Sequence, residues 1–402
     1  MDPTDVDTSN EDNEPFPWEL GVYDAHCHPT DTMSSIDDIP AMNARTLAVM
    51  ATRSEDQELV SQVASKLNGE QSENSQNDTR RICPCFGWHP WFSHQIYDDG
   101  GGKGKENNND DSTFSKENHY KSVLTPSVKD ETLLHHLPDP RPLSSLLSQI
   151  RSNLLKHPGS LVGEIGLDRA FRIPNAWFPH ELENRDQSLT PGSREGRSLS
   201  PYRVHPAHQK AIFKAQLQLA GELRRPVSIH SVQAHGAVFE VLRDLWKGHE
   251  RKVVSNRQRK RRSSAAGAHT ESDDEAEEEG RSRERGSGPR SPLPYPPKIC
   301  MHSYSGPPEP LRQFLHPSIP ADIYFSFSHV INFTNDSDAK VVEVISMLPE
   351  DRILAESDLH CAGQRMDDLL EQVVRKICSV RGWGLRQGVK ILGDNWKRFI
   401  SE

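Results

Sequence analysis

Eight short apolar runs recur along this chain of 402 residues, and they limit the folds that it can adopt. Apolar residues follow one another within each run and do not alternate with polar ones. This is typical of parallel strands buried on both faces. They cover residues 21–28, 46–52, 81–89, 161–167, 226–231, 298–304, 322–328 and 352–358. We therefore expect eight strands in one parallel sheet.

Amphipathic helical patterns lie between several of these runs. Apolar residues with spacings of three and four precede the fourth, fifth and eighth runs, and a further set follows the eighth run. The sets are Leu143, Leu146, Leu147, Ile150 and Leu154; Ile212, Ala215 and Leu219; Val341, Val342, Ile345 and Leu348; and Leu369, Leu370, Val373, Val374 and Ile377. Strands and helices in repeated alternation predict an α/β fold, the (β/α)₈ or TIM barrel.

Polar segments interrupt this pattern. Only 34% of the residues are hydrophobic, so long stretches must lie outside any core. We expect a disordered acidic tail over residues 1–18 and a single barrel over 19–402, with low-complexity insertions at about 98–130, 181–201 and 249–296. The last insertion holds a basic block (257–262) and an acidic block (272–280). The basic block is open to two interpretations, a solvated loop or a nuclear import signal.

Charge and cysteine content exclude several classes of protein. The net charge of −10 argues against a generally basic nucleic-acid-binding surface, although a local basic or metal-lined groove remains compatible with it. The six cysteines form no Cys-x-x-Cys pair, so we expect neither a zinc ribbon nor a thioredoxin motif. We also find no run of about 18 apolar residues and no secretory signal, and therefore expect a cytosolic or nuclear protein without a membrane span.

Side chains that can bind metal ions lie at or near the C-terminal ends of several predicted strands. They are His26, His28, His89, Glu164, His230, His302 and Asp358. In a (β/α)₈ barrel this end carries the active site, so residues distant in sequence are expected to converge there. His26 and His28 alternate along one strand and can face the same ion.

The number of these side chains favours two metal ions over one. Four histidines and two carboxylates are too many ligands for one tetrahedral ion with an open position, but they suit two ions about 3.5–4 Å apart. Mg²⁺, Mn²⁺ and Zn²⁺ all remain possible, and imidazole ligands favour Zn²⁺ and Mn²⁺. Glu164 lies in the middle of an apolar run, where an unpaired carboxylate is costly to bury.

Seven sequence motifs, in order along the chain, resemble those of the TatD family of metal-dependent hydrolases, a branch of the amidohydrolase-like barrels. They are DAHCHP (24–29), GWHPW (87–91), GEIGLD (163–168), QKAIFKAQLQLAGELRRPVSIHS (209–231), MHSYSG (301–306), LAESDLH (354–360) and GDNWKRF (393–399). The resemblance covers the whole patterned core and leaves out only the insertions. The sequence departs from the family pattern at two positions, with His360 in place of proline and Ser357 in place of threonine. We therefore expect the loop after the eighth strand to differ in shape from that of the family, and with it the substrate preference.

The resemblance implies a role for each candidate residue. His26, His28 and Asp358 would hold one metal ion, Glu164 would bridge two, and the pair His230 and His302 would hold the second. His89 would lie beside the ions and contact a substrate phosphate or relay a proton. Asp358 is the expected proton acceptor for the attacking water. Other amidohydrolase-like barrels use a carbamylated lysine as the bridge, but the fourth strand offers no lysine.

The resemblance further implies phosphodiester hydrolysis, and we expect a deoxyribonuclease that acts on DNA from the 3′ end. One alternative is hydrolysis of an ester such as an aminoacyl-tRNA bond. Another is a binding protein, because the charged insertions resemble those of fungal members known as cut-nine-interacting proteins, named for a partner in the cell-cycle ubiquitin ligase. The complete set of candidate ligands counts against a pure scaffold.

Overall fold

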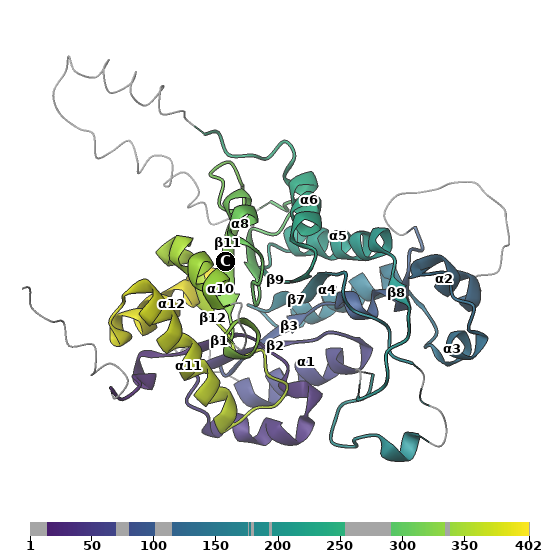
Figure 1. Cartoon of the computed structure of the whole chain (residues 1–402), viewed down its shortest axis with the longest axis horizontal. Coiled ribbons are helices and arrows are strands. Elements are labelled where there is room, and N and C mark those ends of the chain that lie inside the picture. The colour runs from purple at the N-terminus through teal and green to yellow at the C-terminus, as the bar shows by residue number, and fades with distance from the viewer. Residues whose placement is uncertain are drawn as a thin grey trace, which may run out of the picture.

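The computed structural model describes residues 14–69, 80–100, 115–175, 177, 181–192, 195–253, 291–333 and 338–401. Eight parallel strands follow one another in sequence order around a single sheet, as predicted (Figure 1). They are β1 (Tyr23–Cys27), β2 (Thr46–Met50), β3 (Ile82–Phe86), β7 (Leu161–Asp168), β9 (Val227–Val232), β10 (Lys298–Met301), β11 (Asp322–Phe327) and β12 (Ile353–Ala355). The prediction of a (β/α)₈ barrel is confirmed.

The sheet closes where β1 and β12 end. The backbone N–H of Asp358 donates to the carbonyl of His26 at 3.0 Å, and the N–H of His28 donates to that of Leu359 at 2.8 Å. The buried Asp24 carboxylate reinforces this closure by accepting hydrogen bonds from the backbone N–H and the hydroxyl of Ser357. The first and last strands are thus joined at the edge where the sequence predicts the active site.

Helices cover the outside of the barrel. They are α1 (Ser54–Asn68), α4 (Leu143–Lys156), α5 (Pro206–Glu222), α6 (His235–Trp246), α8 (Pro308–Phe314), α9 (His329–Asn332), α10 (Asp338–Met347), α11 (Gln364–Arg381) and α12 (Leu385–Ile400). Short 3₁₀ helices are η2 (Trp18–Leu20), η3 (Pro29–Asp31), η4 (Met33–Ala41), η5 (Pro90–Gln95), η6 (Leu182–Asn184) and η7 (Glu350–Arg352). The helices predicted from periodicity are α4, α5, α10 and α11.

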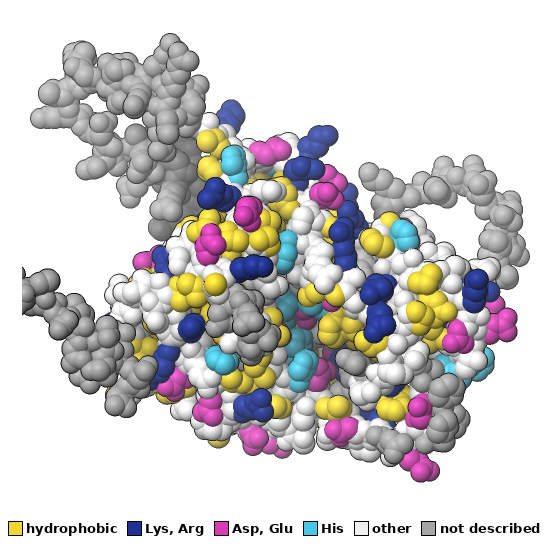
Figure 2. All heavy atoms as spheres, in the orientation of Figure 1, with side chains coloured by type: hydrophobic (Ala, Val, Ile, Leu, Met, Phe, Trp, Pro, Cys, Tyr) yellow, Lys and Arg dark blue, Asp and Glu magenta, His cyan; other side chains and the backbone are white. Residues whose placement is uncertain are grey.

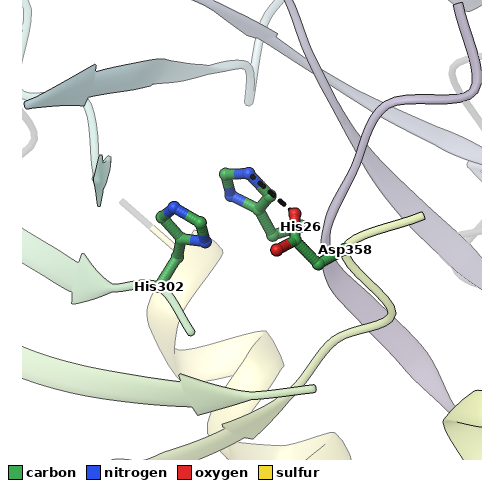
Figure 3. Close-up of side chains that lie close together, drawn as sticks. All are labelled: His26, His302 and Asp358. Carbon is green, nitrogen blue, oxygen red and sulfur yellow. Dashed lines mark ion pairs between the residues drawn. The ribbon is translucent and has the colours of Figure 1, made fainter. Parts of the chain in front are cut away.

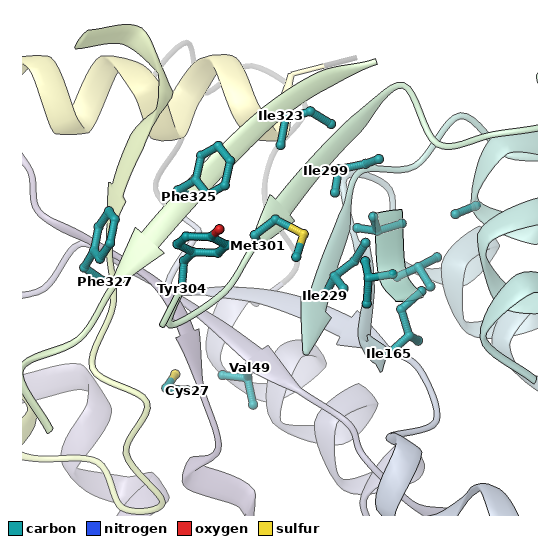
Figure 4. Close-up of a cluster of buried hydrophobic side chains, with 14 of the residues drawn as sticks. Cys27, Val49, Ile165, Ile229, Ile299, Met301, Tyr304, Ile323, Phe325 and Phe327 are labelled. Atoms are coloured by element: carbon teal, nitrogen blue, oxygen red, sulfur yellow. The ribbon is translucent and has the colours of Figure 1, made fainter. Parts of the chain in front are cut away.

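Alternate residues of the strands serve two separate cores. Outward-facing residues such as Val49, Ile229 and Phe325 pack with the helices in the larger cluster (Figure 4). Their neighbours on the strands form a second cluster inside the barrel, which α12 closes with Trp396 and Phe399. This cluster comprises Ala25, Ala48, Met50, Cys83, Cys85, Leu161, Cys300, Tyr324, Leu354, Trp396 and Phe399. Successive residues of a strand face opposite sides of the sheet, and both sides are buried here. Each strand therefore appears in the sequence as a continuous apolar run.

A small lobe lies beside the barrel, on the opposite side from α11 and α12 (Figure 1). It contains α2 (Lys116–Val123), α3 (Glu131–His136) and an antiparallel pair, β5 (Leu124–Thr125) with β8 (Arg203–Val204). A parallel pair, β4 (Ile96–Tyr97) with β6 (Arg141–Pro142), lies near its base. Its own core comprises Tyr120, Val123, Leu124, Val128, Leu133, Leu134, Leu137, Ile173, Tyr202 and Val204.

This lobe corrects part of the predicted insertion at 98–130. Residues 115–130 are folded, because their few apolar side chains share a core with Ile173, Tyr202 and Val204 from much later in the sequence. The rest of that insertion, residues 101–114, lies outside the described residues.

The predicted insertion at 181–201 is also partly folded. The guanidinium of Arg53, only 2% exposed, donates to the carbonyls of Thr190 and Pro191 at 3.2 and 3.0 Å. The N–H of Thr190 donates to the carbonyl of Asp31. These bonds tie residues 190–191 to the loop that follows β1, so the disorder predicted from polar composition is wrong here. The prediction relied on the polar side chains of this segment. The hydrogen bonds that hold it are made by its backbone groups, which the composition does not reveal.

Of the acidic tail predicted over 1–18, residues 1–13 lie outside the described residues, but disorder is wrong for its end, where Phe16 and Trp18 pack against the core and Trp18 begins η2. Of the insertion predicted at 249–296, residues 254–290, which include the basic and acidic blocks, also lie outside the described residues. Within the described part of the chain, no helix is both long and apolar enough to span a membrane.

Candidate metal centre

All seven candidate side chains meet at the C-terminal end of the barrel. His26 comes from β1, Glu164 from β7 and His230 from β9. His28 and His302 directly follow β1 and β10, and His89 and Asp358 lie in the loops that follow β3 and β12. Figure 3 shows His26, His302 and Asp358 converging from three separate segments, with His26 and His302 stacked at 3.8 Å. Glycine at 166 allows this convergence, because a Cβ there would lie 2.0 Å from the carbonyl oxygen of His230.

Glu164 is the centre of the arrangement, and its two carboxylate oxygens serve two different sets of imidazoles. Oε2 lies 3.4 Å from Nε2 of both His26 and His28. Oε1 lies 2.8 Å from His230 Nδ1, 2.8 Å from His302 Nε2 and 3.1 Å from His89 Nε2. The carboxylate is only 3% exposed, so one buried group joins two clusters of nitrogen ligands.

The first set has the dimensions of a divalent metal site. Its Nε2 atoms, from His26 and His28, are 3.1 Å apart, and Asp358 Oδ1 lies 3.9 and 3.6 Å from them. Ligands bound tetrahedrally at about 2.0–2.1 Å from an ion lie about 3.3–3.4 Å from one another. The donor atoms of His26, His28 and Glu164 all lie within 4.8 Å of one another, as do those of His26, His302 and Asp358. Imidazole and carboxylate donors at these separations fit Zn²⁺ or Mn²⁺ without rearrangement.

The electrostatics of the site favour positive charge. Burial alone would raise the pKa of Glu164, but the surrounding imidazoles, His89, His302 and His26 foremost, hold that pKa well below its usual value. Burial also lowers the pKa of His28, yet Asp358 and Glu164 outweigh it and raise that pKa to about 9. The two carboxylates therefore create a negative potential that a bound cation would neutralise.

Of the imidazoles of His230, His26 and His302, two are oriented by a hydrogen bond at their second ring nitrogen. His230 Nε2 lies 3.1 Å from Asp168 Oδ2, which leaves Nδ1 facing Glu164. His26 Nδ1 lies 2.9 Å from Ser228 Oγ. Such partners fix the tautomer of a metal-binding histidine and raise its basicity. The third, His302, has an Nδ1 that makes no hydrogen bond among the described residues, and it lies 3.6 Å from the buried carboxylate of Glu356.

His89 differs from these three. Its Nδ1 accepts a hydrogen bond from the backbone N–H of Trp91 at 3.2 Å. Burial lowers its pKa to about 4, so the ring is neutral near pH 7 and its single proton resides on Nε2. Nε2 then donates to Glu164 instead of offering a lone pair to a metal ion. Although His89 lies as close to Glu164 as the other imidazoles, its hydrogen bonding supports the expected place beside the ions.

Sequence reasoning missed four residues around the centre: Asp24, Asp168, Ser228 and Glu356. Asp24, Asp168 and Glu356 lie within motifs that contain a candidate ligand, and each is a carboxylate in or next to an apolar strand. That placement was a usable signal, since a buried carboxylate needs a partner. Ser228 carries no comparable signal, because a strand serine needs no ligand to be buried.

The loop after β12 departs from the family pattern at His360, and the structure shows what replaces proline. His360 Nδ1 lies 2.8 Å from Asp31 Oδ2, and its ring stacks on that of His28 at 5.2 Å. Asp31 also pairs with the Arg53 guanidinium at 2.9 Å. Burial opposes ionisation of Asp31, but the hydrogen bond with His360 and the charge of Arg53 hold its pKa well below the usual value. The imidazole thus joins the rim of the site to the loop after β1.

Comparisons with known proteins identify the family. The family model described as TatD related DNase matches residues 23–401. The chain belongs to the TatD family. It is 33% identical over 382 residues to the Cut9-interacting protein scn1 of Schizosaccharomyces pombe, which covers 94% of this chain and 98% of that protein. It is 27% identical over 345 residues to an uncharacterized deoxyribonuclease of Saccharomyces cerevisiae, covering 84% and 83% of the two chains.

Solved structures show the same fold. A crystal structure of an uncharacterized amidohydrolase from Saccharomyces cerevisiae superposes with a TM-score of 0.50 at 12% identity, covering 96% of this chain and all of the other. As a TatD-family member, the protein is a metal-dependent hydrolase. The clusters around Glu164 are where the described residues can hold the metal.

Proposed function

We propose that the protein is a two-metal deoxyribonuclease that removes nucleotides from the 3′ end of DNA. Two metal ions are supported by the position of the Glu164 carboxylate. One of its oxygens faces His26 and His28, and the other faces His230 and His302. A carboxylate shared in this way is the usual bridge between two divalent ions. His26, His28 and Asp358 would hold one ion, and His230 and His302 would hold the other.

When bound, such ions polarise a phosphoryl oxygen and lower the pKa of water. Asp358 is placed to accept the proton of the attacking water. Its side chain is 14% exposed, more than those of His26, His28 or Glu164, so it reaches solvent at the rim. Burial would raise its pKa, but hydrogen bonding to His28 and the charges of His302 and His26 hold that pKa well below the usual value, and the group is ionised near neutral pH.

Asp168 and His89 position the rest of the centre. Asp168 fixes the ring of His230 and is itself held by the backbone N–H groups of Ala170 and Phe171. His89 donates to Glu164 and orients its carboxylate. These contacts reduce the reorganisation that the site needs as charge develops on the phosphate.

A DNA substrate is supported by the surroundings of the site and by the relatives. Histidines lie in a hollow near the centre of the face in Figure 2, and basic side chains line its border over α5 and α6. Arg169 and Arg172, both exposed, directly follow β7. Cations at such positions bind phosphates without reading sequence. One relative is named a deoxyribonuclease, and the matching family model is described by the same activity.

Two other functions remain candidates. The same centre could hydrolyse a carboxylic ester such as the aminoacyl bond of tRNA, because a polarised carbonyl needs similar groups. A binding role is supported by the S. pombe relative, whose name records an interaction with Cut9. We further propose a cytosolic or nuclear location, which is supported by the lack of a disulfide bond among the six cysteines, all of which lie in the described part of the chain.

The decisive experiment combines metal analysis with digestion. Purified protein loaded with Zn²⁺, Mn²⁺ or Mg²⁺ is incubated with single- and double-stranded DNA labelled at the 5′ or the 3′ end, and with aminoacyl-tRNA. We expect two metal equivalents and early release of the 3′ label as mononucleotide. Early release of the 5′ label would contradict the polarity, and deacylation of tRNA without DNA cleavage would replace this proposal by the ester hydrolase.

A further inference from the structure

A pocket of about 220 Å³ lies between the small lobe and the rim of the barrel, next to the candidate metal centre. Its lining combines apolar and aromatic side chains with polar ones, among them Glu55, His136 and Arg197. The lining residues that matter here are Trp91, Phe171, Leu137, Pro138, His136 and Arg197. Its volume is below the roughly 300–1,000 Å³ of sites that enclose a drug-sized ligand, and therefore suits a single ring system.

Trp91 and Phe171 form one wall of this pocket as a stacked pair. Their ring centroids are 4.4 Å apart and their planes differ by 9°. The indole N–H of Trp91 donates to Asp168 Oδ2 at 2.6 Å, and Asp168 in turn holds His230. The aromatic wall is therefore separated from a ligand of the metal centre by a single side chain.

Three arginines belong to the pocket or to the segment that carries Phe171. Arg169 and Arg172 are exposed on either side of Phe171 in the sequence. Arg197 lines the pocket itself, and its guanidinium also lies over the ring of Trp177 at 5.9 Å. An apolar aromatic slot flanked by cations is the arrangement that binds one base of a single strand while its phosphates stay at the rim.

We propose that this pocket is a base-binding subsite for the nucleotide next to the scissile phosphate of a single-stranded nucleic acid. This inference rests on the proposed nuclease activity of the same centre and adds a base-binding role for the pocket that the small lobe helps to form. Stacking accepts any base, so the subsite selects single strands over duplexes without selecting a sequence. The small lobe supplies Leu137 and Pro138 to the pocket and is therefore part of substrate recognition.

The first test compares a normal oligonucleotide with one that carries an abasic nucleotide at single positions near the cleaved end. For the wild-type protein, loss of one particular base should raise KM by about 5- to 150-fold, the range that corresponds to the stacking of one base on an aromatic side chain. The variant Phe171→Leu keeps apolar volume but lacks the ring. It should show a raised KM on the normal strand and little further effect of the abasic position.

Two control variants separate a subsite from a structural role. Phe171→Tyr keeps the ring and should retain base dependence. Phe239→Leu removes an aromatic side chain from a different pocket, about 420 Å³ in volume and lined by α6 and α8, and should leave base dependence unchanged. If Phe171→Leu lowers activity equally on normal and abasic strands, the residue is only structural and the subsite is refuted.

A binding experiment keeps this inference distinct from the nuclease proposal. Metal-loaded protein is titrated with a cleavage-resistant phosphorothioate strand that carries 2-aminopurine near its 3′ end. Stacking should quench the fluorescence with wild type and Phe171→Tyr, and much less with Phe171→Leu. Quenching without cleavage of normal DNA would sustain the subsite and overturn the nuclease. Cleavage with neither quenching nor abasic dependence would sustain the nuclease and overturn the subsite.

Discussion

The two ends of the barrel interior bury their side chains by opposite means. At the end where the strands begin, Ala48, Cys85 and Cys300 fill the barrel and Trp396 covers them, so the stabilisation comes from apolar burial and packing. At the end where the strands finish, five imidazoles and two carboxylates occupy the same cross-section.

The two ends therefore contribute differently: the apolar end contributes stability, and the polar end carries the candidate metal ligands. Buried ionisable groups cost free energy unless cations or hydrogen bonds compensate them, so the polar end depends on its ligands. The apolar end needs no ligand and can hold the barrel closed while the polar end changes its occupant. We expect substitutions at the two ends to separate activity from stability, and the following predictions test that separation.

The largest effect should follow from Glu164→Gln at the polar end. The amide keeps the size of the side chain but lacks the charge that holds two nearby cations. We expect at least one metal equivalent to be lost and hydrolysis to fall by at least about 1,000-fold, equivalent to about 4 kcal/mol. Metal analysis, circular dichroism and DNA digestion on one preparation measure this. Retention of two metals with near-normal cleavage would refute the bridge, and unfolding would make Glu164 a structural ion-pair partner.

The next effect should appear at the apolar end, with Trp396→Ala. This side chain is 1% exposed, so its truncation should lower the free energy of unfolding by about 3–5 kcal/mol. Trp396→Phe is the matched control, because it keeps a ring and removes a buried N–H that makes no hydrogen bond. Its cost should be clearly smaller than that of Trp396→Ala, because it leaves a smaller cavity. Denaturant titration measures the free energy of unfolding of both variants. If a fully folded variant had a changed metal content, the two ends would not be independent.

A smaller effect is expected for His89→Ala. Because His89 donates to Glu164 through Nε2, its loss should lower turnover by about 10- to 100-fold while two metals remain bound. His89→Gln retains an N–H donor and should recover part of the activity. An emptied metal site in His89→Ala would instead make His89 a ligand, and the argument from its hydrogen bonding would be wrong.

The smallest effect should come from residues 254–290, which lie outside the described part of the chain. Replacing them with a short Gly/Ser linker should change the free energy of unfolding by less than about 0.5 kcal/mol, because their sequence is polar and rich in like-charge blocks. The melting temperature should therefore stay within about 2 °C. A large drop in a thermal melt would show that the segment packs against the barrel.

The barrel could be predicted from sequence because its signals are local. Each strand is an apolar run of its own, and the order of strands along the chain is also their order in the sheet. The small lobe could not be predicted, since Tyr120 and Leu133 find their core partners in Ile173 and Tyr202 far along the chain. Pairings of this kind leave no periodic signal in either segment.

The candidate centre was predictable for a related reason. A carboxylate or imidazole at the end of an apolar strand is visible in sequence, and the barrel topology says that such ends meet. The sequence could not predict which ring nitrogen of each histidine makes which hydrogen bond. That His230 faces Glu164 through Nδ1, or that Trp91 sets the tautomer of His89, depends on side-chain placement that no spacing encodes.

The closure between β1 and β12 has a consequence for the timing of synthesis. His26 and His28 leave the ribosome early, whereas Asp358 and Ser357, which complete the ligand set and bond to Asp24, come near the end of the sequence. At about 5–20 residues per second, roughly 20–70 s separate the two. Until the end of that interval a nascent chain has neither the last candidate ligand nor the closed sheet. We therefore expect the metal centre to be completed only after translation has passed the final strand.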